Sequence, residues 1–176
     1  MKAWQHFKTI TVHRLVVCGG CFRMGLYWQG LTHDLSKYSP TEFWIGARYF
    51  QGDKSPNAAE RTDKGYSEAW MHHKGRNKHH FEYWTDYNPK SKLVEPVKMP
   101  VRYVAEMFCD RVAASKIYHK DNYTDSTALE YYKLGHHRYV IHPESDALLR
   151  KLLIMLSRKG EAYTFRYIRE VVLKNM

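Results

Sequence analysis

The segment of residues 31–37 places a histidine and an aspartate side by side, at His33 and Asp34, with Lys37 three residues after the aspartate. Adjacent side chains within a helix point about 100° apart, so they rarely reach the same target. Where a helix ends, the backbone turns, and both side chains can approach one ion. An imidazole nitrogen and a carboxylate oxygen together suit a borderline or hard divalent metal. The alternative is a surface His–Asp pair at a helix C-terminus.

Two further residues favour a metal site. His13 lies on the apolar side of a helix expected over residues 4–18, and Asp110 lies within a helix expected over residues 100–120. An unpaired carboxylate on or beside an apolar helix face would be costly, and a metal or a neighbouring arginine would explain it. A lone histidine on such a face is usually a core residue, so ligation by His13 depends on the His-Asp pair that follows it.

The order His, His-Asp, Asp on separate helices resembles the HD superfamily of metal-dependent phosphohydrolases, and residues 33–37 look like the His-Asp-x-x-Lys form of many of its members. The resemblance implies an HD-like helical fold in which one divalent ion is held by His13, His33, Asp34 and Asp110. Residues 33–37, with a later His-His run, are also similar to an uncharacterised bacterial and phage family. That second resemblance implies no activity.

A second dense stretch, residues 70–84, contains four histidines within nine residues. HD members with two metals carry extra histidines between the His-Asp pair and the last Asp. The resemblance therefore implies a second ion here, with Asp34 bridging the two metals. Only two or three of the four histidines are expected to ligate; His73 and His79 are the first candidates, followed by His80 and then His72.

Basic and aromatic residues surround these histidines and support a different interpretation. Single-stranded nucleic acid could stack on the aromatic rings and pair its phosphates with Lys74, Arg76 and Lys78. A basic binding protein without catalysis would use Arg76, Lys78, Tyr83 and Trp84 to hold nucleic acid or an acidic protein. A third alternative is an inactive relative that keeps a metal for stability alone.

The leading hypothesis is a metal-dependent phosphohydrolase acting on a nucleotide or another phosphoester, with Asp34 and Lys37 as catalytic residues. Lys37 would bind the substrate phosphate, or it could simply sit at a helix C-terminus, where the dipole favours a cation. The weaker substrate-binding candidates are Lys74, Asn77 and Arg111; Asn77 could instead form a helix C-terminal turn. The donors suit Mn, Fe, Zn, Mg, Co or Ni and do not distinguish among them.

The composition of the chain is consistent with either a small phosphorylated substrate or nucleic acid as its partner. The chain has 176 residues and a formal net charge of +10, with eleven further histidines. Such a chain should attract polyanions, either a small phosphorylated substrate or nucleic acid.

The N-terminus has no signal-peptide apolar core, and the longest apolar stretch, residues 15–22, is broken by two glycines and is too short for a membrane span. We therefore expect a cytoplasmic protein that does not enter membranes.

The three cysteines do not make a disulfide framework. Cys18 and Cys21 have CxxC spacing, but no second pair exists for a zinc ribbon. We expect buried or incidental thiols. No phosphate-binding glycine loop and no nucleophile elbow is present in the sequence.

The pattern of apolar residues predicts an all-α bundle of about six to eight helices, and strand-like alternation is nearly absent. We expect one domain, residues 1–176, with the metal-site helices in residues 4–120 and packing or oligomerisation helices in residues 125–174. Helices are expected over residues 4–18, 22–33, 40–50, 66–74, 100–120, 125–134, 143–158 and 161–174. Gly19 and Gly20 should break or bend the first, and Ser39, Pro40 and Glu42 form a capping box at the start of the third. Residues 51–65 should be a loop, with a short turn at 57–61, that could act as a lid, and residues 88–99 a connector.

Overall fold

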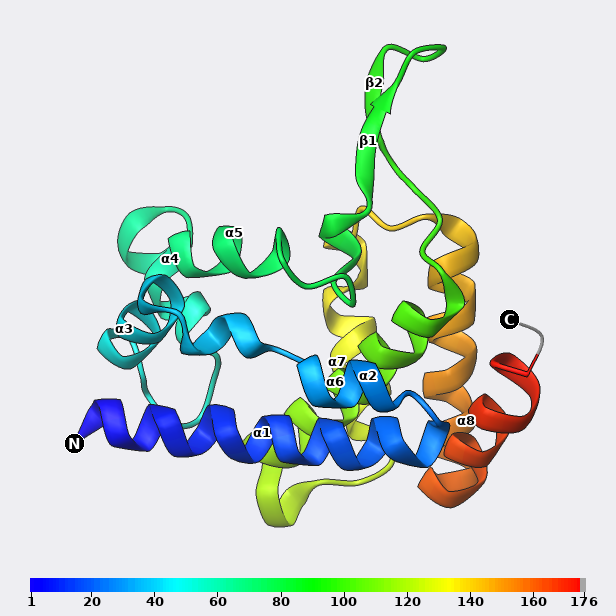
Figure 1. Ribbon diagram of the computed structural model, residues 1–176, viewed down its shortest axis with the longest axis horizontal. Helices are drawn as coiled ribbons and strands as arrows, with labels where there is room; N and C mark the ends of the chain where they lie inside the picture. Colours follow the sequence, from blue (N-terminus) through cyan, green and yellow to red (C-terminus); the bar gives the residue numbers. More distant parts are fainter. Residues whose placement is uncertain (175–176) are drawn as a thin grey trace.

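The computed structural model describes residues 1–174, and within them nearly every element is helical (Figure 1). The α-helices are α1 (Lys2–Met24), α2 (Tyr27–Thr32), α3 (Pro40–Arg48), α4 (Pro56–Lys64), α5 (Glu68–Lys74), α6 (Val101–His119), α7 (Thr127–Gly135) and α8 (Pro143–Tyr167). Short 3-10 turns are η1 (Leu35–Tyr38), η2 (Phe81–Tyr83), η3 (Lys120–Asn122) and η4 (His136–Arg138), and η5 (Ile168–Val172) is a π turn. The all-α prediction is confirmed, as is the expected range of helix number for this part of the chain.

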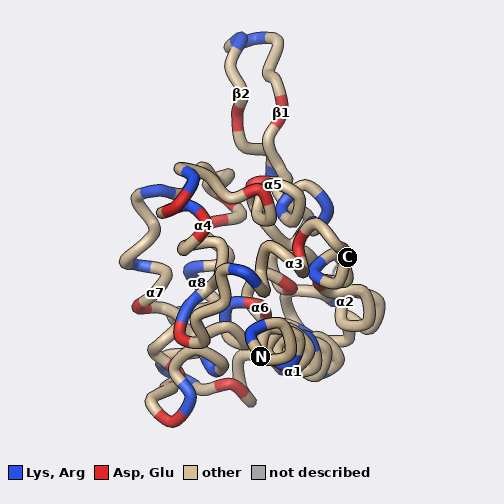
Figure 2. Tube along the Cα trace, turned by 90° about the vertical axis from the view of Figure 1, so that its left-hand side faces the viewer, with Lys and Arg blue, Asp and Glu red and all other residues tan. Residues whose placement is uncertain are grey.

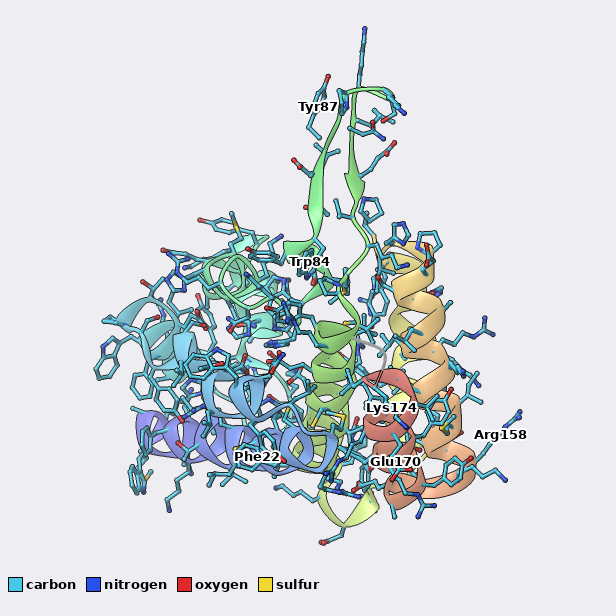
Figure 3. All side chains as sticks on the ribbon, turned by 45° about the vertical axis from the view of Figure 1, so that its right-hand side comes forward. Phe22, Trp84, Tyr87, Arg158, Glu170 and Lys174 are labelled. Carbon is cyan, nitrogen blue, oxygen red and sulfur yellow. The ribbon has the colours of Figure 1, made fainter. Side chains whose placement is uncertain are left out.

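One departure from the helical pattern is a β-hairpin formed by β1 (Thr85–Asn88) and β2 (Leu93–Pro96). It projects from the helices as an arm, with Trp84 at its base and Tyr87 far out along it (Figures 1 and 3). The predicted connector over residues 88–99 was therefore wrong at residue 88, which ends β1, and over residues 93–96, which form β2. Each strand has only four residues, which is too short to show the alternation that identifies strands in a sequence.

The core lies between α1, α6 and α8. α6 contributes Val104, Ala105, Phe108 and Val112, all almost fully buried, because these residues recur at helical spacing on one side. α8 faces them with four fully buried leucines, at positions 149, 152, 153 and 156. Burial of each such side chain contributes about 1.5–3 kcal/mol, so this packing fixes where α6 holds Asp110.

The predicted break at Gly19 and Gly20 was wrong, because α1 continues to Met24 and ends at Gly25, which adopts a left-handed conformation with φ 82°. Gly20 lies against α6, and a Cβ there would collide with Sγ of Cys109. The glycine thus permits close helix packing rather than a bend. The second predicted helix shrinks to α2 as a result. All three cysteines are free, and two of them are buried, as expected.

The segment between α3 and α5 is more ordered than its composition indicated. Residues 51–65 were predicted as a loop with a short turn at 57–61, but a full helix, α4, occupies Pro56–Lys64, with proline in its first turn and left-handed Gly65 at its end. In the C-terminal part, Gly160 has φ 77° and ψ 173°, which separates two helical segments close to the boundary expected from the sequence.

Charged residues are distributed over many elements. In Figure 2 the Lys and Arg positions occur on α1, on α8 and at the tip of the hairpin, with Asp and Glu among them. At the base of the hairpin, the Lys78 ammonium lies 5.9 Å from the centre of the Tyr83 ring, and the indole of Trp84 donates a 2.7 Å hydrogen bond to the Lys78 carbonyl. No helix within residues 1–174 combines the length and apolar character needed to cross a bilayer.

Candidate metal centre

Side chains from five separate parts of the chain converge at one buried place. His13 comes from α1, His33 and Asp34 from the junction of α2 and η1, and Asp110 from α6. The remaining members come from α5 and from the loop after it: His73, His79 and His80. We call these seven residues the ligand cluster. All seven are the residues that the sequence predicted as metal ligands.

Asp34 lies at the middle of the ligand cluster. Its backbone is left-handed, with φ 54° and ψ 25°, and its side chain is fully buried. This conformation is uncommon for a residue other than glycine. Here it ends α2 sharply, so that the side chains of His33 and Asp34 reach the same place even though they are adjacent in sequence. The turned backbone expected at this helix end is therefore present.

The first group of donors surrounds Oδ2 of Asp34. Nε2 of His13 lies 3.7 Å from this oxygen and 2.9 Å from Oδ1 of Asp110. Nε2 of His33 lies 3.4 Å from the same Asp34 oxygen and 3.6 Å from the same Asp110 oxygen. These donor atoms lie within 4.8 Å of one another, close enough for a single divalent ion to contact all four residues.

The second group surrounds the other oxygen of Asp34. Nε2 of His73 lies 3.2 Å from Oδ1 and Nε2 of His79 lies 3.5 Å from it. His80 completes this group, with its ring centroid 4.1 Å from that of His79 and one ring nitrogen within 4.8 Å of the other donors. The two groups share Asp34, so one carboxylate faces two sets of ligands. His72 turns away to Glu42 and is in neither group.

Two glutamates contact the Nδ1 atoms of cluster histidines and so orient the histidine rings. Oε1 of Glu106 lies 2.9 Å from Nδ1 of His33 and 3.3 Å from Nδ1 of His79. Oε2 of Glu42 lies 2.7 Å from Nδ1 of His73. An ionised carboxylate only accepts hydrogen bonds, so each of these Nδ1 atoms carries the proton and each Nε2 keeps its lone pair for a metal.

Neither glutamate was recognised in the sequence as part of the site. Glu42 was assigned to a capping box, and that assignment was wrong for its side chain: Ser39 does cap α3 by accepting from the Glu42 amide at 3.4 Å, but the carboxylate binds the histidines of α5. Glu106 precedes Asp110 by four residues, so both lie on one side of α6, and this spacing was the one available signal.

The cluster leaves an unusual number of buried polar atoms without a hydrogen bond. Within residues 1–174 they include Nε2 of His13, His33, His79 and His80, together with both carboxylate oxygens of Asp34. Charged neighbours lie close to some of these atoms, but not in hydrogen-bonding geometry. Each unsatisfied buried group costs about 1–3 kcal/mol, and most buried polar groups in proteins are paired. A divalent ion in each group would satisfy these atoms, with one oxygen of Asp34 facing each ion.

The electrostatics of the cluster also suit a cation. Burial opposes charge on Asp34, but the neighbouring His33, Lys37 and His73 hold its pKa well below its usual value. Burial likewise opposes charge on Asp110, and the neighbouring His13 and His33 keep its pKa well below its usual value. Both carboxylates are therefore ionised at neutral pH.

Two histidines of the cluster are neutral. Burial, followed by the charge of Lys37, lowers the pKa of His13, and burial, followed by His79 and His73, lowers the pKa of His80 well below its usual value. His33 differs: burial disfavours its charged form, but Asp34 and Asp110 raise its pKa well above the usual value. Positive charge is thus favoured at Nε2 of His33, whether a proton or a metal supplies it. The buried histidines and carboxylates could hold a metal ion.

The predicted substrate-binding residues lie at different distances from the cluster. Nζ of Lys37 is 2.6 Å from Oδ2 of Asp34. Asn77 is buried and donates to Oγ of Ser36 and to the carbonyl of His73, both at 2.8 Å, so it ties η1 to the end of α5.

Arg111 and Lys74 are less directly connected. The Arg111 guanidinium donates to the hydroxyl of Tyr139 at 3.2 Å and lies over the Tyr139 ring, 5.1 Å from its centre. Lys74 is half-buried at the end of α5. Among the described residues, neither makes an ion pair with a member of the ligand cluster.

Residues 2–155 match a protein family described as a family of unknown function (DUF5662). The chain belongs to this family. The matched part contains the whole ligand cluster together with Glu42 and Glu106, so the centre lies within the DUF5662 region. Neither the curated proteins nor the solved structures contain a significant match to the chain.

Proposed function

We propose that this DUF5662 protein is a metal-dependent phosphohydrolase that acts on a nucleotide or another phosphoester. The observation that carries the proposal is the position of Asp34, whose two oxygens face two separate groups of buried histidine and carboxylate donors. A shared carboxylate of this kind is what a pair of neighbouring divalent ions requires. The order of the ligands along the chain, which resembles the HD superfamily, supports the same function.

The two groups of the ligand cluster would each hold one divalent ion. One ion would be held by His13, His33, Asp34 and Asp110, and the other by Asp34, His73, His79 and His80. Bound divalent ions supply Lewis acidity, activate water as a nucleophile near neutral pH and neutralise charge on phosphoryl oxygens. Glu106 and Glu42 would fix the ring orientations, as the partners behind metal-binding histidines usually do. The nitrogen and oxygen donors suit Mn, Fe, Zn, Mg, Co or Ni.

Lys37 would position the substrate phosphate. Burial disfavours its charge, but Asp34 and Asp110 raise its pKa above the usual value, so the side chain stays cationic. A lysine beside a cationic centre is favourable when an anion lies between them, and a phosphoryl group is such an anion. The net charge of +10 would help to attract the substrate.

Metal analysis followed by an activity screen tests this function. Protein purified without added metal should contain one or two equivalents of a transition metal, and with added Mn it should hydrolyse at least one member of a phosphoester panel. Asp34→Ala should lose both metal and activity. Asp146→Ala is a matched control, because Asp146 also pairs with a histidine, His136 at 2.9 Å, but lies outside the ligand cluster. Metal-free protein that cannot be loaded, or loaded protein without activity, would contradict the proposal.

A second candidate function is a basic binding protein for nucleic acid or an acidic partner. The exposed Arg76 and Lys78 beside Tyr83 and Trp84 favour it, because cations next to aromatic rings suit single strands. Binding of this kind should weaken steeply as salt rises. A flat salt response, or no binding at low salt, would dismiss it.

A further inference from the structure

The β-hairpin stands apart from the helical body. It consists of β1, β2 and the turn between them, residues 85–96, which we call the arm. The arm points away from the helices (Figures 1 and 3). Each strand has only four residues, and a two-stranded hairpin on its own is at best marginally stable in water. An arm of this kind gains stability when it packs against a second surface.

The pairing of the strands divides the side chains of the arm between two faces. Asp86 lies opposite Glu95, and the next pair on the same face is Asn88 with Leu93, because alternate residues of a strand point the same way. The Asn88 amide donates to the Glu95 carboxylate at 2.7 Å across this face. We call it the acidic face. Leu93 is 62% exposed there, and the adjacent Val94 points to the opposite face.

The charges of the arm are arranged in two zones. Asp86 and Glu95 lie directly opposite each other in the middle of the arm, an arrangement that destabilises a strand pair. Lys90 and Lys92 lie at the exposed tip. Figure 2 shows the tip in blue and an acidic position on each strand below it. Within residues 1–174, no ion pair joins any of these four side chains to another residue. The acidic middle and the basic tip are therefore both left without a counter-charge.

The spacing of the two zones is symmetric about the pair of Asn88 and Leu93. Asp86 lies two residues before Asn88 and Lys90 lies two residues after it, which is about 7 Å along a strand in each direction. A two-fold axis through this pair therefore exchanges the middle and the tip. A second arm laid antiparallel on the acidic face would place its tip over the acidic middle of the first arm, and the reverse, with the two Leu93 side chains in contact at the axis. This is the geometry of a self-complementary interface.

We infer that the acidic face of the arm binds the same face of the arm of a second copy of the chain, in antiparallel orientation, with each basic tip on the other arm's Asp86 and Glu95. Charge complementarity favours this partner. A nucleic acid or an acidic protein would bring negative charge to the acidic middle, whereas a second copy brings both signs in the matching order. The inference goes beyond the proposed function and does not depend on the metal centre.

The size of the arm sets the strength of the contact. Because the arm projects, the two bodies, each part of a chain with a formal net charge of +10, stay apart. Contact between two faces of four-residue strands falls below the usual area of specific interfaces, so we expect a dissociation constant on the order of 10 µM. Sedimentation equilibrium of the purified chain from about 1 to 200 µM spans this value. The mass should rise from 21.0 kDa towards twice that value.

Charge reversal identifies the contact. The tip variant carries Lys90→Glu and Lys92→Glu, and the middle variant carries Asp86→Lys and Glu95→Lys. Each variant alone should dimerise about tenfold more weakly than the parent, or worse, because like charges then meet. An equimolar mixture of the two variants should regain dimers at close to the parent's dissociation constant, since both contacts between tip and middle then join opposite charges.

Matched controls separate the contact from effects of net charge and folding. Lys133→Glu with Lys159→Glu reverses two exposed lysines of α7 and α8 and should leave the dimer intact. Leu93→Asp places two carboxylates at the axis and should weaken the dimer about tenfold or more. Val94→Asp, at the next residue but on the opposite face, should not. The comparison of Leu93→Asp with Val94→Asp also serves if a charge-reversed variant does not fold.

Four results would overturn the inference. The parent could stay monomeric throughout, or both charge-reversed variants could dimerise like the parent, which would assign the dimer to another surface such as the C-terminal helices. The mixture could fail to restore the dimer that each variant loses alone. Finally, a monomeric parent that binds a single-stranded oligonucleotide through its tip lysines would show that the arm contacts nucleic acid instead.

Discussion

Nζ of Lys37 lies 2.6 Å from Oδ2 of Asp34, the same oxygen that faces His13 and His33. The ammonium therefore approaches the centre from the side of the first group of ligands. η1 holds it there, because this short turn starts at the left-handed Asp34 and brings the side chain of Lys37 back over the carboxylate. A cation in this position could reach an anion held by metal ions in the cluster without being a ligand itself.

From this position we predict that Lys37→Ala keeps its metal and loses activity. Turnover of the best phosphoester should fall by about two orders of magnitude, the scale seen when one charge-stabilising group is removed. Metal content, measured by elemental analysis, should match the parent. Lys37→Arg should recover part of the rate, because it restores the cation. Turnover at the parent rate in Lys37→Ala would show that Lys37 is only a surface cation at the end of its turn.

The sharing of Asp34 predicts a pattern of metal stoichiometry. If the parent binds two ions, His13→Ala should weaken only the first group and His80→Ala only the second, so each variant should retain about one equivalent under conditions that saturate the parent. Asp34→Ala should retain neither, because both groups lose a ligand. Titration with Mn or Zn, followed by elemental analysis of the dialysed protein, measures the three values. Equal loss in all three variants would argue for one ion in a single mixed site.

The glutamates behind the histidines predict changes in metal affinity. Glu106→Gln should weaken binding by about 10- to 100-fold, because a neutral amide oxygen is a weaker acceptor for the two Nδ1 atoms than the charged carboxylate. Glu42→Gln should weaken the second group alone, since its partner in the cluster is His73. Glu161→Gln removes a glutamate that is ion-paired with Arg23, away from the cluster, and should leave affinity unchanged. Competition with a metal-binding dye gives the affinities.

The residues that converge in the ligand cluster could be predicted from the sequence, but the glutamates that contact their histidines could not. His13, His33, Asp34 and Asp110 were found because their types and order along separate helices resemble a known ligand pattern. Glu42 and Glu106 contact histidines that lie 31 and 73 residues away in the sequence, and no local pattern reports such a contact. Only the packing of α3 against α5 and of α6 against the His33 turn reveals them.

Contacts between residues far apart in the sequence also explain the errors in the predicted fold. α6, which has a long apolar side, was placed to within one residue of its observed ends. Gly20 was misread because its role depends on Cys109, a residue of another helix. α4 was expected only as a short turn at residues 57–61, because its exposed face and its proline make the segment look like a loop. Tertiary contact decides such segments, and local composition does not.

The burial of His6 predicts that the folded protein loses stability in acid. Its ring is buried against Phe43 and Phe50 of the segment that includes α3, and burial, followed by the Lys37 charge, lowers its pKa from 6.5 to about 4. The unfolded chain therefore binds more protons than the folded chain in this range. The contribution of the neutral His6 ring to the free energy of unfolding is fully present above pH 6.5 and is lost as the pH falls through 4.

Urea unfolding at several pH values between 4 and 7 measures this effect. His6→Phe should remove on the order of 2 kcal/mol of the parent's acid sensitivity, while His137→Phe, at an exposed position, should not. The comparison with the parent matters, because folding also shifts the pKa values of His13, His33 and His80. An unchanged pH slope in His6→Phe would mean that His6 does not resist protonation in the folded state.

The two adjacent glycines of α1 provide a test of the helix packing that supports the centre. Gly20 faces α6, where a methyl group would collide with Sγ of Cys109 and lie 3.1 Å from Cε1 of Phe165. Gly20→Ala should therefore cost about 1–3 kcal/mol of unfolding free energy, the usual range for overpacking a core. It should also weaken metal binding, because α1 carries His13 and α6 carries Asp110.

Gly19 is the matched position, with no atom within 4 Å of the place where a Cβ would lie. Gly19→Ala should stabilise the protein by about 0.5–1 kcal/mol, since alanine is favoured over glycine within a helix. Urea unfolding measures both free energies, and metal titration measures the second effect. If α1 were broken at these glycines, as the sequence alone indicated, both alanines would act alike. Opposite signs at neighbouring residues would show instead that one helix runs through both positions and packs on Cys109 at only one of them.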